Sequence, residues 1–369
     1  MMSGMNFLRR YILKCGPMGQ PGFEIGNVTN AKETALHISF SIEKSDAETA
    51  NTAKVQIWNL SERNLKILEA RDCIVELKAG YGDNMALVLV GNVTSAITTS
   101  DNADRMTELE VVDGRVALRD TDVSVSLNGA VNCMDVYTFL AAQMGIPVIF
   151  APDLTYRILP NGFSFVGAAR NGLQKLAGCC GHSWSIQNQI LQVTWPGRPV
   201  SVRGYLLNND SGLIDVPKRI TLAASSGSGE QNNGWEIRYF LNGAIGVNDI
   251  VMMESSVVSG YFRIQKVTMD GDNLEGDWIC TAQVLEIADA PVSVSQAEGD
   301  GRGIKKGDKV KVIRTIEQSG KTKGYQYAGG TFVCWYDVYD VIRSVGDRVI
   351  IGIGSTVTAA VNINDLEKV

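Results

Sequence analysis

Thiols and an imidazole stand together at one place in the chain, Cys179-Cys180-Gly181-His182. A zinc site needs about four ligands with room between them, and adjacent cysteines cannot easily both face one ion. A Cys–His nucleophile pair needs separated residues and a third group that orients the base. The other histidine, His37, lies in a segment of alternating polarity that predicts a strand. We therefore predict a helix end with buried small thiols here, without a catalytic or metal-binding role.

Four carboxylates gather between two predicted strands, Tyr261–Met269 and Trp278–Leu285. They belong to Asp270, Asp272, Glu275 and Asp277. A pair of carboxylates can cleave a glycosidic bond, and a loop that offers ligands at alternate positions can bind Ca²⁺. The spacing here lacks that alternation, and a hydrophilic hairpin turn accounts for these residues. No glycine-rich loop that could bind phosphate opens a helix after a strand. From these candidate sites together, we predict no enzymatic activity, no cofactor and no metal ion.

Aromatic residues near the C-terminus are the best candidates for a surface site, because basic side chains accompany them. Such a surface is suited to sugar polymers or to another protein. The predicted interaction surface consists of Tyr325, Tyr327, Trp335, Tyr336, Lys321 and Lys323. Core packing of a small β-barrel explains at least half of the aromatic residues equally well.

Strand patterns dominate the elements that must position these residues. The segment Ala53–Ile97 predicts a strand, a short helix capped by Ser61, and two further strands, Cys73–Tyr81 and Met85–Ile97, with one shared apolar face. The 38 glycines against 9 prolines favour the many tight turns of an all-β architecture. Neighbouring strands of this kind predict a barrel or sandwich, with a second barrel later in the chain.

A helical period interrupts the strands after residue 130. Asn132 can cap a helix that ends at Gly145, and a second helix is expected at about Gly167–Ala177. A hairpin that turns at Asn188 follows. These elements predict a small α+β domain inserted between the two barrels.

The expected fold class is mainly β with this α+β insert, and the chain is expected to divide into five segments. They are a first β-barrel domain at 1–127, the α+β domain at 128–196, a second β-barrel domain at 197–290, a linker at 291–303 and an SH3-like barrel at 304–369. The linker is predicted from its composition, PVSVSQAEGDGRG. Residues 304–369 hold ten basic and seven acidic residues in a chain of net charge −6, which suggests a separately folded module.

Bulk properties exclude several classes of protein. The acidic balance gives no reason to expect sequence-specific binding of nucleic acid. Seven cysteines without CxxC spacing argue against a disulfide framework. The first residues, MMSGMNFLRRYILKCG, predict no secretion signal, and no run approaches the roughly 20 apolar residues of a membrane helix. We expect synthesis in a reducing cytoplasm and no membrane partner.

A succession of short motifs in the second barrel resembles the tail-hub, or baseplate-hub, proteins of tailed bacteriophages, whose counterparts form the hub of type VI secretion spikes. The motifs are Gly212-Leu213-Ile214-Asp215-Val216-Pro217, Gly234-Trp235-Glu236, Val247-Asn248-Asp249, Ser259-Gly260-Tyr261-Phe262 and Gly276-Asp277-Trp278. In the first barrel and the insert, Ile57-Trp58-Asn59-Leu60-Ser61, Gly80-Tyr81-Gly82 and Phe163-Ser164-Phe165 fit the same family. Separately, Tyr339-Asp340-Val341-Ile342 and Gly346-Asp347-Arg348 resemble SH3-like modules of phage tail and cell-wall proteins.

The resemblance implies a structural virion protein without enzymatic activity, found in a phage tail baseplate or a phage-like particle. It implies a homotrimer in which two similar barrels per chain give six near-equivalent copies around the tail axis. The implied partners are the six-fold tail tube protein, a three-fold spike or tail-tip protein, and tape-measure and baseplate proteins. The alternative functions are a cell-wall (peptidoglycan)-binding tail protein and a component of a wall hydrolase.

Overall fold

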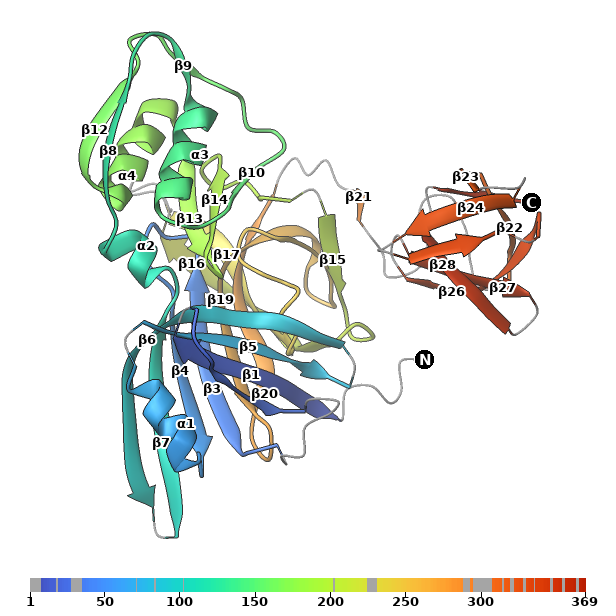
Figure 1. Ribbon diagram of the computed structural model, residues 1–369, viewed down its shortest axis with the longest axis horizontal. Coiled ribbons are helices and arrows are strands. Elements are labelled where there is room, and N and C mark those ends of the chain that lie inside the picture. Colours follow the sequence, from blue (N-terminus) through green and yellow to red (C-terminus); the bar gives the residue numbers. More distant parts are fainter. Residues whose placement is uncertain are drawn as a thin grey trace. The chain divides into compact units, whose positions relative to one another are not determined.

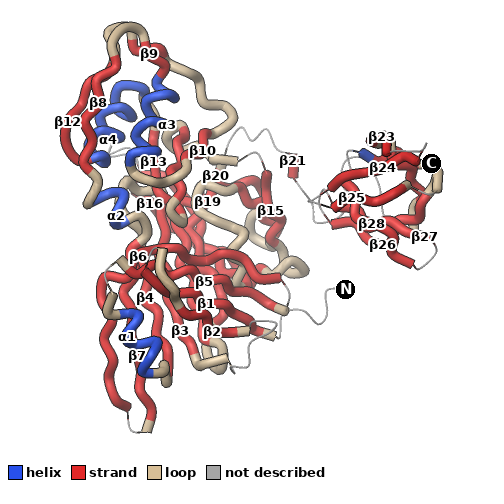
Figure 2. The backbone as a smooth tube through the Cα atoms, viewed as in Figure 1, coloured by secondary structure: helices blue, strands red, loops and turns tan. Residues whose placement is uncertain are grey.

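The computed structural model divides into two compact bodies, Met1–Val292 and Ser293–Val369, which are described separately (Figure 1). Strands predominate in both, and the described part of the chain has four α-helices (Figure 2). The structure describes residues 8–17, 19–27, 35–70, 72–82, 84–101, 103–201, 203–223, 231–287, 293–294, 307–313, 315–318, 322–327, 330–334, 336–345, 348–353, 356–362 and 365–369.

The first β unit comprises seven strands and one short helix. Alternate burial defines its strands, as in β5, where Cys73, Val75, Leu77 and Ala79 are all buried. The helix begins after Ser61, whose side chain accepts a hydrogen bond from the backbone N–H of Asn64, as the sequence predicts. The elements are β1 (Arg9–Pro17), β2 (Phe23–Gly26), β3 (Ile38–Ser45), β4 (Thr52–Trp58), α1 (Glu62–Leu68), β5 (Cys73–Tyr81), β6 (Asn84–Asp101) and β7 (Asp104–Val112).

The second β unit follows the insert and has six main strands. The long strand β19 carries Phe262 and Ile264 into the core, and its partner β20 buries Trp278, Cys280, Ala282 and Val284. The strands are β15 (Arg203–Leu207), β16 (Leu213–Ala223), β17 (Gln231–Phe240), β18 (Ile250–Glu254), β19 (Ser259–Asp272) and β20 (Trp278–Glu286), with β21 (Ser293–Val294) assigned to the other body.

The two β units have the same strand order. The first runs β3-β4-β7-β6-β5-β1 and the second runs β16-β17-β20-β19-β18-β15. When the short strand β2, which pairs only with β1, is left out and the other six strands of each unit are numbered along the chain, both orders are second, third, sixth, fifth, fourth, first. The last pair differs, because β1 and β5 are antiparallel whereas β15 and β18 are parallel. The fold therefore contains one arrangement of strands twice.

The two units are joined edge to edge. Strand β3 pairs with β19 in an antiparallel ladder, which joins the strands of both units into one sheet. Their buried side chains form a single hydrophobic cluster. Trp278 lies at this junction, where its indole Nε1 donates to the carbonyl oxygen of Gly80 at 3.2 Å and its ring meets Phe40 edge-on. The junction is thus packed as a protein interior rather than as a loose contact between domains.

The insert lies at one end of the first body, where two helices pack beside a strand pair (Figure 1). Asn132 caps α3 by accepting from the N–H of Met134, as predicted, whereas the second helix begins and ends later than expected because Gly167 is still in a strand and Gly181 ends the helix at φ +73°. The elements are α2 (Arg115–Arg119), β8 (Asp122–Leu127), β9 (Val131–Asn132), α3 (Cys133–Gln143), β10 (Val148–Phe150), β11 (Ile158–Leu159), β12 (Phe163–Ala168), α4 (Ala169–Cys180), β13 (Ser183–Gln187) and β14 (Ile190–Thr194).

The second body has its own small apolar core, which includes Val310, Tyr339, Val349 and Ile351. Five of its strands form one sheet in the order β28-β27-β26-β22-β29, and β23-β24-β25 form another. The strands are β22 (Lys309–Val312), β23 (Ile316–Gln318), β24 (Thr322–Tyr327), β25 (Gly330–Val333), β26 (Tyr339–Val345), β27 (Arg348–Ile353), β28 (Thr356–Asn362) and β29 (Leu366–Lys368). Within the described residues of both bodies, no helix has the length and apolar character that crossing a membrane requires.

Candidate functional site

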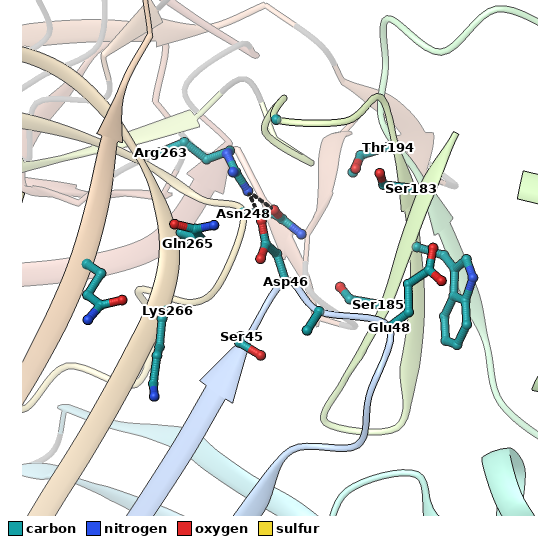
Figure 3. A pocket seen from close by; sticks show the side chains of 14 residues that line it. Ser45, Asp46, Glu48, Ser183, Ser185, Thr194, Asn248, Arg263, Gln265 and Lys266 are labelled. Atoms are coloured by element: carbon teal, nitrogen blue, oxygen red, sulfur yellow. Dashed lines mark hydrogen bonds and ion pairs between the residues drawn. The ribbon is translucent and has the colours of Figure 1, made fainter. Parts of the chain in front are cut away.

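A polar pocket of about 380 Å³ lies where the two β units and the insert meet (Figure 3). The loop after β3 contributes Asp46, strand β19 contributes Arg263, and Asn248 precedes β18. The insert contributes Ser183 and Ser185 from β13. We call this site the junction pocket, because each of its walls comes from a different part of the first body.

Arg263 is the central charge of the junction pocket, and its side chain is only 2% exposed. Its Nη1 donates to Oδ2 of Asp46 at 2.8 Å and to Oδ1 of Asn248 at 2.7 Å. The Asn248 amide in turn donates to Oε1 of Gln192 in the insert at 3.2 Å. One buried guanidinium therefore links the first β unit, the second β unit and the insert. A buried ion pair contributes little net stability but imposes one geometry, because each misplaced partner would be left unpaired.

A second polar cluster fixes the β13–β14 hairpin onto the first β unit. Its turn residues Asn188 and Gln189 both have positive φ, and their backbone N–H groups donate to Asp113 at 2.6 and 2.8 Å. The Asn51 amide donates to the carbonyl oxygen of Ile186 at 2.8 Å. This hairpin is the one that the sequence places at Asn188, and buried side chains of the first β unit hold it.

Lys44 completes this cluster as a buried cation. Its Nζ donates to Oδ1 of Asn188 at 2.6 Å, and burial lowers its pKa to about 8, although Asp113 acts in the opposite direction. Burial likewise raises the pKa of Asp113 above its ordinary value, against the opposing effects of Lys44 and the hydrogen bonds. Neighbouring charge and hydrogen bonds thus only partly offset the cost of burying these two groups.

Hydroxyl, amide and charged side chains line the junction pocket. Its hydroxyl groups come from Ser45, Ser183, Ser185 and Thr194, and among the described lining residues none is a histidine or a cysteine. The hydrogen bonds that involve Arg263 and Asn248 hold three parts of the fold in fixed positions.

The structure separates the two adjacent cysteines of the sequence-predicted site. Cys179 is exposed at the end of α4, whereas Cys180 and His182 are buried. Burial raises the pKa of Cys180 to about 12 and lowers the pKa of His182. The two buried residues lie beside Cys133, at the start of α3. The prediction of a helix end with a buried thiol is confirmed for Cys180 and is wrong for Cys179.

The other histidine lies in the first body too, but its partner is a turn residue. His37 Nε2 is 3.0 Å from Oδ2 of Asp272, and its ring stacks on Trp58 at 3.9 Å between centroids. Asp272 also accepts from the N–H groups of Leu274 and Glu275, so turn chemistry accounts for it as predicted. Hydrogen bonding to His37 and to these N–H groups lowers the pKa of Asp272 in spite of partial burial, which raises it.

The predicted aromatic surface stays a prediction. Lys321 and Trp335 lie outside the described residues, and for Lys323, Tyr325 and Tyr327 only the backbone of β24 is described. Tyr336 is 55% exposed, as a surface residue should be. Its ring meets Tyr339 edge-on, at 5.9 Å between centroids.

Sequence reasoning missed Arg263, Asp113 and Cys133. Arg263 left a visible signal, since a charged residue stands between Phe262 and Ile264 in a strand that is otherwise apolar at this point. Asp113 and Cys133 gave no local signal, because their partners lie far away in the sequence.

Comparison with known proteins gives a likeness of structure rather than of sequence. No protein-family model matches the chain, and no curated protein does. The 43 kDa tail protein of prophage MuSo2 from Shewanella oneidensis superimposes with a TM-score of 0.50 at 12% identity, over 75% of this chain and 98% of that one. An E. coli component of the type VI secretion system, which exhibits structural similarity to the T4 bacteriophage tail proteins gp27 and gp5, superimposes with a TM-score of 0.50 at 9% identity, over 93% and 98%. The resemblance stated from the sequence is therefore confirmed for the fold, which is one that phage tail and type VI secretion proteins share.

Proposed function

We propose that this chain is a structural, non-enzymatic protein of a phage tail or phage-like particle, in which three copies form a hub around the tail axis. The observation that carries the proposal is the doubled strand order, with both copies joined side by side through β3 and β19. Three such chains offer six near-equivalent β units. A ring of this kind matches a six-fold tail tube on one side and a three-fold spike on the other.

The strand edges support a ring of this type. Strand β19 pairs with β20 on one edge, and the other edge of Lys266–Asp272 pairs with β3. The equivalent strand in the first unit is β6, in which residues 95–101 pair with β7 and, among the described residues, with no second strand. The equivalent of β3 is β16, which ends the described ladder. Within one chain, β19 pairs with β3. The two equivalent strands, residues 95–101 of β6 and β16, each have an edge available for pairing with another copy of the chain.

A bulge at the same place in β6 and in β19 shows how the residues of these two equivalent strands align. Strand β19 has an irregularity between Ile264 and Lys266, and β6 has one between Val93 and Ser95. Aligning them makes Lys266–Asp272 equivalent to residues 95–101. Residues 95–101 of one copy then pair antiparallel with β16 of the next, as β19 pairs with β3 within one chain. A heterologous contact of this kind closes into a ring when the rotation is suitable.

This register places Ile97 opposite Ile220 of the neighbouring copy. Ile97 is 59% exposed on an edge that soluble proteins normally protect, and Ile220 is half-buried. A cross-strand pair of β-branched side chains stabilises a ladder. The bulge between Ile214 and Lys218 in β16 has no counterpart in β3, so the contact between copies is shorter than the one within the chain.

The proposed partners follow from this position in the particle. The ring binds tail tube protein on its six-fold face and a spike or tail-tip protein on its three-fold face. Tape-measure and baseplate proteins are further proposed partners. The protein is located in the phage tail or phage-like particle.

Thiol cross-linking tests the ring and its register. The protein carries Ile97→Cys and Ile220→Cys in a Cys179→Ser background, which removes the exposed native thiol of the first body. A short bifunctional maleimide should give covalent products that end at the trimer, and the native mass should be three times the 40.0 kDa chain mass. Ile97→Cys combined with Val166→Cys is the control, because Val166 is 79% exposed but lies in β12 of the insert.

Two results would overturn the proposal. One is a monomer at every protein concentration, and the other is equally efficient cross-linking by the control pair. A trimer that caps purified tail tube protein in electron micrographs would support the assignment to the hub.

A further inference from the structure

Three groups that ligate soft metal ions converge in the core of the insert. Cys133 is the first residue of α3, Cys180 is the last residue of α4, and His182 follows two residues later. Their ligating atoms all lie within 4.8 Å of one another, and all three residues are buried. Two thiolates and one imidazole around a tetrahedral zinc ion need separations of only about 3.5–4 Å, which small side-chain shifts achieve.

His182 lacks the hydrogen bonds that a buried imidazole needs. Neither Nδ1 nor Nε2 has a partner among the described residues, and both atoms are shielded from solvent. A neutral imidazole has one N–H donor and one acceptor nitrogen, so two polar atoms are left unsatisfied. Its aromatic neighbours Tyr137 and Trp195 approach at 5.9 and 4.9 Å between ring centroids. A metal ion bound to one ring nitrogen would satisfy that atom.

One backbone N–H donates to a sulfur atom of this cluster. The backbone N–H of Arg157 donates to Sγ of Cys133 at 3.4 Å, and the Arg157 guanidinium donates to the carbonyl oxygen of Cys179. An N–H donor to a ligating sulfur atom, as at Cys133, stabilises the negative charge of the thiolate. The hydroxyl of Tyr137, whose ring lies beside that of His182, is also buried and has no partner among the described residues.

We propose that the insert binds one Zn²⁺ ion through Sγ of Cys133, Sγ of Cys180 and a ring nitrogen of His182. Sulfur and imidazole ligands select zinc over magnesium or calcium, which prefer oxygen. Binding displaces the two thiol protons, and the site is neutral with two thiolates and one divalent cation.

The ion would join the start of α3 to the end of α4 and so stabilise the insert. That insert carries the hairpin β13–β14, which Asp113 and Asn51 attach to the first β unit. The role is structural, and it does not depend on the proposed hub function. The sequence did not predict this site, because it suggested Cys179 as the neighbour of Cys180, and the Cys179 thiol is exposed to solvent.

Metal analysis of the full chain tests the proposal. Protein purified without chelators should hold about one zinc ion per chain, and Co²⁺ substitution should give the charge-transfer absorption of a cobalt thiolate. Cys133→Ser, Cys180→Ser and His182→Gln should each lower the metal content or affinity at least about tenfold. Cys179→Ser is the matched control and should leave both signals unchanged.

Metal content measured on the wild-type protein tests the proposal even if the variants fold poorly. Folded wild-type chain with less than about a tenth of an equivalent of zinc after reconstitution, and without cobalt–thiolate absorption, would overturn the proposal. A disulfide between Cys133 and Cys180 under reducing purification, or equal loss of metal in Cys179→Ser, would overturn it too.

Discussion

Gly271 stands directly opposite Phe40 in the β3–β19 ladder, and a Cβ added to it would lie 2.3 Å from Cζ of the Phe40 ring. Phe40 is only 3% exposed, so its ring cannot move aside into solvent. The two β units therefore approach each other at a place where a hydrogen atom is the largest side chain that fits.

Gly271→Ala should consequently destabilise the first body. Overpacking a closely packed core costs about 1–3 kcal/mol. Urea unfolding followed by tryptophan fluorescence, to which Trp278 in the same junction contributes, measures the loss. Gly178→Ala is the control. Gly178 lies in α4 with nothing within 4 Å of an added Cβ, and the same substitution there should stabilise the protein by about 0.5–1 kcal/mol. Equal effects at both positions would contradict the close approach of the two units.

Arg263→Met should be more harmful than loss of an exposed arginine. It leaves the partly buried carboxylate of Asp46 without its guanidinium partner, and breaking a buried pair in this way costs about 3–5 kcal/mol. Arg238→Met removes a pair of the same length, 2.8 Å to Asp215, but both side chains are at least 38% exposed. That control should lose less than about 1 kcal/mol. Matching losses in chemical denaturation would show that the junction pocket does not depend on Arg263.

Asp249 should give the second β unit a pH-dependent stability. Burial raises its pKa from 3.8 to about 6, although the backbone N–H of Gly246, at 2.8 Å from Oδ2, acts in the opposite direction. Between pH 3.8 and about pH 6, Asp249 is protonated in the folded state and ionised in the unfolded state. Stability contributed by this group is therefore present below about pH 4 and is lost as the pH rises through 6, by up to about 3 kcal/mol.

Asp249→Asn keeps an oxygen acceptor for Gly246 but removes the ionisation. The variant should match the wild type near pH 4 and exceed it in thermal stability at pH 7.5. The control Asp210→Asn changes an exposed residue and should follow the wild-type profile. A wild-type stability that rises from pH 4 to pH 6 relative to Asp249→Asn would contradict the direction of the shift.

Local elements were the predictable part of this fold. The helix after Ser61, the helix after Asn132 and the hairpin at Asn188 are all present, because capping residues and turn residues act over a few positions. The short helix α2 escaped prediction, since Gly114 before it offers no side-chain cap and five residues carry no clear period.

Long-range pairing was not predictable in the same way. Nothing near Phe40 in the sequence specifies that β3 adds to β19, because the ladder depends on the complementary shapes of Phe40 and Gly271. The candidate zinc site has the same character. Cys133 shows no ligand spacing relative to Cys180, and only the packing of α3 against α4 brings the thiols together.

The doubled strand order has an evolutionary consequence. A scaffold encoded twice within one polypeptide can diverge at either copy, whereas identical subunits must all change together. The bulge in β16, which β3 lacks, is a difference of this kind between the two copies. Each copy of the strand order can therefore acquire features that the other copy lacks.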